Sequence, residues 1–143
     1  MTAVEVLDPP PFAAPLRAVD RIELLPGEPT TVRVVKTVRA TDPYLGGHFP
    51  DLTMLPGVFL VEAVRQAAAA VLGPRGGAYP EVRELRSARF LLPMLGGEDI
   101  TSDIELTGTD GEEVEVAVRC RRGDGRLVAT LTLRLGWGAP DAA

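Results

Sequence analysis

Residues 56–72 read PGVFLVEAVRQAAAAVL, and this stretch decides the fold because it is the only segment with a convincing helical pattern. Pro56 suits the first helical position, where its missing N–H costs nothing. Gly73-Pro74 follows the segment as a C-terminal stop signal. The alanines at 67–70 keep the helix thin, so that a sheet can approach it closely. We therefore expect one apolar helix, Pro56–Leu72, covered by a sheet.

Strand patterns lie on both sides of this helix. The expected strands are rich in Val and Thr or alternate with period two, as in an antiparallel sheet with one buried face. They are 16–25, 30–39, 81–92, 100–106, 114–120 and 127–135. Turn signals such as Pro26-Gly27 and Asp110-Gly111 separate them. This order predicts one α+β domain over residues 16–136, between a Pro-rich, irregular N-terminal arm (1–15) and a C-terminal tail (137–143).

Composition narrows the functional classes. The 143 residues are 45% hydrophobic and 24% charged, which is ordinary for one soluble domain. Apolar runs such as Ala67–Leu72 are far shorter than the ~20 residues that cross a bilayer, and the N-terminus lacks signal-peptide features. We expect a cytoplasmic protein with no membrane segment. The formal net charge of −5 argues against nonspecific nucleic-acid binding.

The chain has one cysteine, Cys120, and one histidine, His48. These counts exclude an intrachain disulfide and make an all-protein zinc cage implausible. Cys120 is in phase with three valines and is expected to be a buried small hydrophobe. His48 is the natural candidate for acid–base chemistry near neutral pH, because only imidazole titrates there unperturbed.

Chemistry concentrates in the stretch 47–66. His48 lies in a Gly/Pro-constrained loop just before the helix. Pro56 has no N–H, so the Gly57 N–H is the first free donor at the positive end of the helix dipole, where it can hold a polarised oxygen. Glu62 is a carboxylate on an otherwise apolar helix, and burial should raise its pKa.

These three groups fit loss of water from a 3-hydroxyacyl thioester. Such a reaction needs a base for the proton beside the carbonyl, an acid for the departing hydroxyl and a donor for the oxygen that gains enolate character. His48 suits the base, Glu62 the acid and the Gly57 N–H the donor. No metal or cofactor is needed.

The sequence also resembles the FabZ-type 3-hydroxyacyl-acyl-carrier-protein dehydratases over roughly residues 16–135. The resemblance rests on Gly-His-Phe-Pro at 47–50, Pro-Gly-Val at 56–58 and Glu-Ala-x-x-Gln at 62–66. It implies a hot-dog fold, a curved antiparallel sheet wrapped around a central helix. It also implies a homodimer or a trimer of dimers, acting on acyl carrier protein or coenzyme A thioesters in fatty-acid or polyketide biosynthesis. Each active site would combine His48 of one subunit with Glu62 of the other.

Further residues take roles from this resemblance. The expected substrate contacts, along an acyl tunnel that Phe90 can gate, are Phe49, Pro56, Val58, Gln66 and Phe90. Gln66 can orient the Glu62 carboxylate, although a surface role is nearly as plausible. Arg83, Arg86 and Arg89 are expected to share one strand face and to form a docking patch for an acidic carrier protein. A plain solvated edge is an equal alternative.

Two other functions stay open. One is a hot-dog thioesterase, in which the helix carboxylate activates water without a histidine. The other is a non-catalytic acyl-binding subunit that keeps the fold. Glu62 also has a structural alternative, since it can pair with Arg65 or with an arginine of another subunit.

Overall fold

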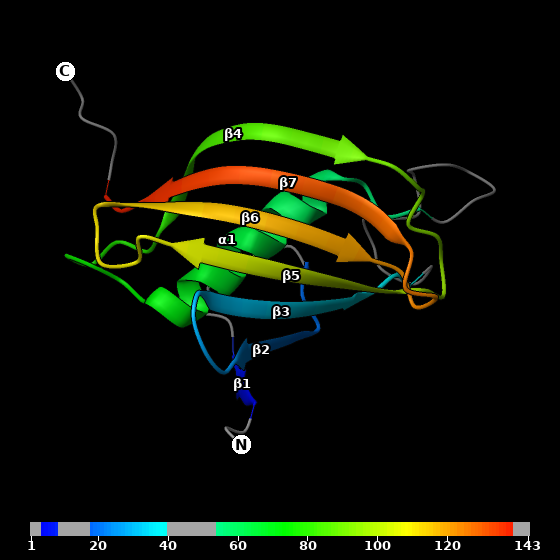
Figure 1. Cartoon of the computed structure of the whole chain (residues 1–143), viewed down its shortest axis with the longest axis horizontal. Coiled ribbons are helices and arrows are strands. Elements are labelled where there is room, and N and C mark those ends of the chain that lie inside the picture. The colour runs from blue at the N-terminus through cyan, green and yellow to red at the C-terminus, as the bar shows by residue number, and fades with distance from the viewer. Residues whose placement is uncertain (1–3, 9–17, 40–53, 139–143) are drawn as a thin grey trace.

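The computed structural model of the chain describes residues 4–8, 18–39 and 54–138. Within them the chain forms one helix, α1 (Val58–Leu72), and one seven-stranded antiparallel sheet (Figure 1). The strands are β1 (Glu5–Leu7), β2 (Arg21–Leu25), β3 (Thr30–Thr37), β4 (Glu81–Phe90), β5 (Asp99–Thr107), β6 (Glu113–Arg121) and β7 (Leu127–Gly136). Their order across the sheet is β1-β2-β3-β5-β6-β7-β4, so β4 is an edge strand.

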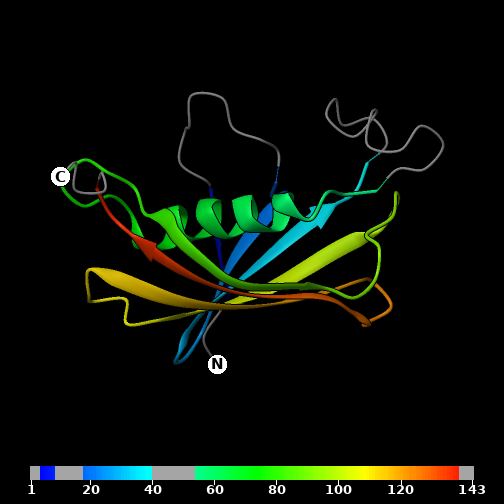
Figure 2. The same cartoon turned by 90° about the horizontal axis from the view of Figure 1, so that it is seen from above.

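The helix lies along one face of the curved sheet, as Figure 2 shows, which confirms the predicted arrangement. Gly57 is the N-cap, and the Gly73 N–H closes the last turn on the Ala69 carbonyl at 3.0 Å. Gly73 has a φ of 70°, which glycine adopts without steric cost. Ala67 and Ala68 have no exposed surface, so the small side chains do let the sheet approach closely. In the described ranges, no helix is long and apolar enough to span a membrane.

Strands β3, β5 and β6 bury alternate residues, as their period-two patterns predict, whereas β4 has no buried residue. On β5 and β6 the buried side chains are Ile100, Ser102, Ile104, Leu106, Val114, Val116, Val118 and Cys120. They join the inward residues of α1 in one hydrophobic core. The outward face of β5 and β6 therefore carries most of their polar and charged residues.

Both ends of the chain differ from the sequence prediction. Glu5–Leu7 is not irregular but forms β1, which pairs with β2. The tail was predicted to begin at 137, yet Trp137 packs against the core. Its Nε1–H donates to the Gly73 carbonyl at 2.9 Å, and the Arg75 guanidinium lies 3.5 Å from the ring centroid. Trp137 thus ties the end of β7 to the end of α1.

A polar cluster fixes the end of β3, the strand that leads toward the segment with His48. Asp20 accepts hydrogen bonds from the Thr37 N–H at 2.7 Å and from Arg39 at 2.9 Å. The ammonium of Lys36, only 2% exposed, lies 4.0 Å from the same carboxylate. Burial alone would raise the pKa of Asp20, but these hydrogen bonds and positive charges outweigh it and lower that pKa below its ordinary value.

We expect Asp20→Asn to lower the free energy of unfolding at pH 7 by about 1–3 kcal/mol, because charge-assisted hydrogen bonds are lost beside a buried ammonium. The folded-state pKa of Asp20 is depressed, so its contribution is present above pH 3.8 and lost as pH falls through the folded pKa. The difference between wild type and variant should therefore shrink in acid. Urea unfolding at pH 7 and well below pH 3.8 measures it, with Asp110→Asn in an exposed turn as the control. An equal penalty at both pH values would contradict the ionic role.

Candidate active site

The residues that precede α1 are joined to the connection between β4 and β5. The Leu55 N–H donates to the Met94 carbonyl at 2.8 Å, and Met54 forms an isolated antiparallel bridge with Leu95. These bonds place the N-terminus of α1 beside the end of β4, although the two elements are far apart in the sequence.

An open, largely apolar pocket of about 420 Å³ lies at this junction. The described residues that line it are Met54, Leu55 and Gly57 on one side and residues 90–94 on the other. Its volume falls within the ~300–1,000 Å³ of small-molecule sites. Phe90 is 53% exposed at the pocket and is not a core residue. Of the other expected substrate contacts, Pro56 and Val58 flank Gly57 without being among these lining residues.

Gly57 is required at the junction for space and not for its conformation. Its φ of −58° is open to any residue. A Cβ at this position, however, would lie 2.6 Å from two atoms of the Phe90 ring. Among the described residues no hydrogen bond occupies the Gly57 N–H. Gly57 therefore lines the pocket at the start of the helix, beside the exposed Phe90 ring, and the oxyanion role of its N–H stays a prediction.

Glu62 projects from the second turn of α1 and is held by two neighbours on the same helix. The Arg65 guanidinium donates two hydrogen bonds to the Glu62 carboxylate, from Nε to Oε2 at 2.9 Å and from Nη2 to Oε1 at 2.5 Å. Gln66 donates its Nε2–H to Oε1 at 3.0 Å. Burial alone would raise the pKa of Glu62, but the hydrogen bonds from Arg65 and Gln66 and the charge of Arg65 lower it. The predicted rise in pKa is therefore wrong for the single chain, since the fork of Arg65 stabilises the ionised form.

Gln66 is buried, with only 3% of its surface exposed. The alternative of a surface role is thus wrong, and the hydrogen bond to Glu62 has the i,i+4 geometry anticipated from the sequence. Its contact with substrate stays a prediction. His48 and Phe49, the candidate base and another candidate contact, lie outside the described residues. Among the predicted site residues, the structure thus places Gly57 and Phe90 at one pocket and joins Glu62 to Gln66 by a hydrogen bond.

The three arginines of β4 do not form one simple patch. The strand has register irregularities between Val82 and Glu84 and between Leu85 and Ser87, so Arg83 and Arg86 have no paired position on β7. Arg83 donates to the backbone carbonyls of Trp137 and Gly138. It therefore anchors the C-terminal end of β7.

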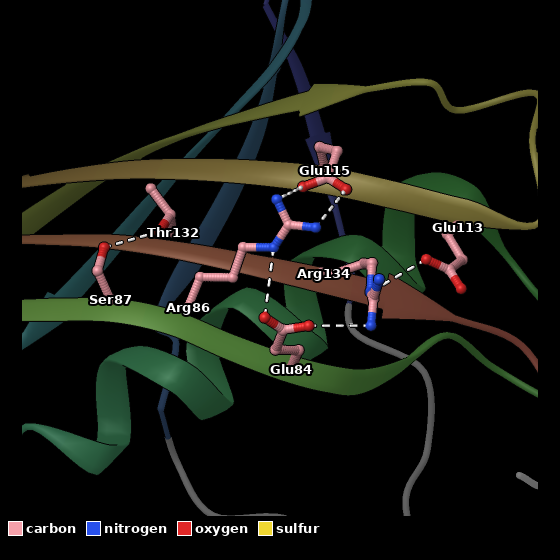
Figure 3. Close-up of polar contacts among 7 residues, drawn as sticks. All are labelled: Glu84, Arg86, Ser87, Glu113, Glu115, Thr132 and Arg134. Carbon is pink, nitrogen blue, oxygen red and sulfur yellow. Dashed lines mark hydrogen bonds and ion pairs between the residues drawn. The ribbon is translucent and has the colours of Figure 1, made fainter.

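Arg86 lies on the outer face of the sheet within a network of carboxylates (Figure 3). Its guanidinium is 3.5 Å from Glu84 and 3.2 Å from Glu115. Arg134 continues the network, 2.9 Å from Glu84. Arg89 is exposed and pairs in register with Thr130. Carrier-protein docking at these arginines stays a prediction, and Arg83 and Arg86 would have to serve it in addition to these contacts.

Cys120 is buried, as predicted. The Ser102 hydroxyl donates to its Sγ at 3.2 Å. Burial raises the pKa of the thiol to about 11, so the thiolate that a nucleophile needs is scarce at neutral pH. Across the described residues no group of three or more His, Cys, Asp or Glu side chains is arranged to hold a metal ion.

The sequence matches known proteins over most of its length. Residues 26–131 match the ApeI-like family, ApeI dehydratase. A 3-hydroxyacyl-[acyl-carrier-protein] dehydratase FabZ from Thermus thermophilus is 32% identical over 137 residues, covering 92% of this chain and 94% of its own. The FabZ of Myxococcus xanthus is 33% identical over 151 residues, with 97% of each chain covered.

The fold has solved counterparts as well. A hot-dog-like protein from Thermanaerovibrio acidaminovorans superposes with a TM-score of 0.60 at 19% identity, covering 78% of this chain and 83% of that one. The likeness confirms the expected hot-dog fold: one helix packed against a curved antiparallel sheet.

Proposed function

Because the chain belongs to the ApeI-like and FabZ dehydratase family, we propose that it removes water from a 3-hydroxyacyl thioester to leave the trans-2-enoyl thioester. The observation that supports this proposal most directly is that Gly57, the N-cap of the helix that carries Glu62, lines the apolar pocket. The enzyme is then a hydro-lyase of fatty-acid or polyketide biosynthesis.

Each proposed group has one task in the reaction. His48 takes the proton from the carbon beside the thioester carbonyl, and the electron pair left behind forms the new double bond. Glu62, in its protonated form, gives its proton to the hydroxyl on the next carbon, which leaves as water. The Gly57 N–H stabilises the thioester oxygen while it carries negative charge. A positioned acid or base typically contributes about 10²–10⁴-fold, and we propose that these groups act without a cofactor.

The proposed substrate carrier is acyl carrier protein, which is part of the name of the FabZ relatives, with coenzyme A as the other source of the same thioester. A homodimer or a trimer of dimers would join His48 of one subunit to Glu62 of another. The edge strand β4, with Leu85 46% and Phe90 53% exposed, offers apolar surface for such an assembly. We place the enzyme in the cytoplasm, where acyl thioesters are made and consumed.

A second candidate is thioester hydrolysis, favoured by one observation. Glu62 is held ionised by Arg65, and an ionised carboxylate is suited to take a proton from water. Hydrolysis releases a free thiol, whereas dehydration leaves the thioester intact.

The deciding experiment offers the purified protein a panel of 3-hydroxyacyl thioesters, on carrier protein and on coenzyme A, with several chain lengths. We expect enoyl absorbance to rise and mass spectrometry to record loss of one water without thiol release. Thiol release without enoyl product would establish the hydrolase instead. Neither product from any member of the panel would overturn both candidates.

A further inference from the structure

Arg65 and Glu62 form an ion pair on α1 in which two hydrogen bonds join the guanidinium to the carboxylate. They are three residues apart, so they lie on the same side of α1. Their side chains are only 19% and 20% exposed. Two parallel N–H···O bonds to a carboxylate fix its orientation as well as its charge, and a lysine in place of the arginine could not reproduce them.

Arg65 also reaches beyond its own helix. Its Nη1 lies 3.7 Å from Glu81 at the start of β4, and the Glu81 side chain is 53% exposed. Among the described residues, the charged group in contact with Glu62 is Arg65 on α1, and Glu81 on β4 acts on Glu62 through Arg65. The guanidinium therefore lies between a half-buried carboxylate that is proposed to react and an exposed one that is not.

This placement opposes the chemistry assigned to Glu62. A general acid must carry a proton, whereas a cation within hydrogen-bond distance favours the ionised carboxylate. We propose that Arg65 is a positioning residue that orients Glu62 and governs whether Glu62 carries a proton during turnover. This inference rests on the proposed dehydration, with Glu62 as the acid.

The expected pH dependence follows from the sign of this interaction. With Glu62 as the acid, the rate falls as pH rises through the pKa of Glu62. Arg65 lowers that pKa, so the falling limb lies at lower pH in the wild type than it would without the guanidinium. Removing the positive charge should move the limb upward by roughly one to three pH units, the usual effect of one close opposite charge.

The test compares Arg65→Met, which keeps an unbranched stem and removes the charged guanidinium, with Arg65→Lys, which keeps the charge and removes the two-bonded geometry. Two quantities are measured on the full-length protein: kcat/KM for dehydration from pH 3 to 9, a range that includes the lowered pKa of Glu62, and the titration of the Glu62 carboxyl carbon by NMR. Arg33→Met is the matched control, because Arg33 grips Asp103 with the same two-bonded geometry on β3 and β5, at 2.8 and 3.2 Å.

We expect Arg65→Met to raise the falling limb and the Glu62 titration together, Arg65→Lys to leave both near the wild-type pH with a lower kcat, and Arg33→Met to change neither. An unchanged Glu62 titration in Arg65→Met would overturn the inference. A raised titration in a protein that makes no enoyl product would overturn the dehydratase function and leave the electrostatic role of Arg65 standing. If kcat/KM rises with pH instead of falling, and this rise moves to higher pH in Arg65→Met, the control of Glu62 protonation by Arg65 is supported and the acid role of Glu62 is overturned.

Discussion

Glu62→Gln is expected to lower kcat for dehydration by about 10²–10⁴-fold, the usual contribution of a positioned proton donor. The amide has the shape of the carboxyl, and its one carbonyl oxygen can still accept hydrogen bonds from Arg65 Nη2 and Gln66 Nε2, while the bond from Arg65 Nε is lost because the NH2 group is a donor. The apolar packing of the helix should be kept. It cannot release a proton to the departing hydroxyl. Steady-state kinetics with a 3-hydroxyacyl thioester at several pH values measures the loss, and thermal unfolding checks that the variant is folded.

Glu105→Gln is the matched control, because Glu105 is exposed on the outer face of β5. It should change kcat less than twofold. His48→Ala should cause a loss similar to that of Glu62→Gln, and the double variant should lose little more than either alone, since one acid and one base act in a single step. Wild-type activity in folded Glu62→Gln would contradict the assignment.

Much of the fold is predictable from hydrophobic periodicity. The helix was expected at Pro56–Leu72 and runs from Val58, and the four C-terminal strands lie where alternation placed them. The three-residue β1 escaped prediction because its pairing with β2 is a tertiary contact that so short a segment does not encode locally. The packing of Trp137 could not be predicted for the same reason, because its hydrogen bond is to the carbonyl of Gly73, which is distant in the sequence.

The candidate site was predictable in its members and less so in its electrostatics. Spacing alone placed Gln66 near Glu62, because residues four apart share a helix face. The same rule allowed the pair with Arg65, yet composition does not reveal whether a long side chain turns toward the carboxylate or toward solvent. The pKa of Glu62 was therefore expected to rise with burial, whereas the hydrogen bonds and charge that accompany burial reverse its direction. The sequence also did not reveal the register irregularities of β4. The expected shared face of Arg83, Arg86 and Arg89 was unsound in any case, because residues three apart lie on opposite faces of a regular strand.

Gly57→Ala is expected to lower kcat/KM by roughly 10²-fold, the loss that a misplacement of about 1 Å can cause in an active site. The backbone at Gly57 is already in the right-handed helical region, and alanine is a better helix former than glycine, so stability should not fall through local propensity. The damage comes from the new Cβ, which would lie 2.6 Å from the Phe90 ring. Either the ring moves within the pocket or the start of α1 shifts, and both displace the substrate from the N–H that should hold its thioester oxygen.

A double-mutant cycle separates this steric cause from a loss of folding. Phe90→Ala removes the atoms that the new Cβ would meet, and Phe90 is exposed enough that its truncation should leave the core intact. Gly57→Ala should therefore cost much less activity in the Phe90→Ala background than in the wild type, with at least about tenfold recovery, equal to 1.4 kcal/mol of coupling. If Gly57→Ala costs the same in both backgrounds, the ring is not what requires glycine. If it costs nothing in either, the carbonyl of the substrate does not approach the helix at this residue.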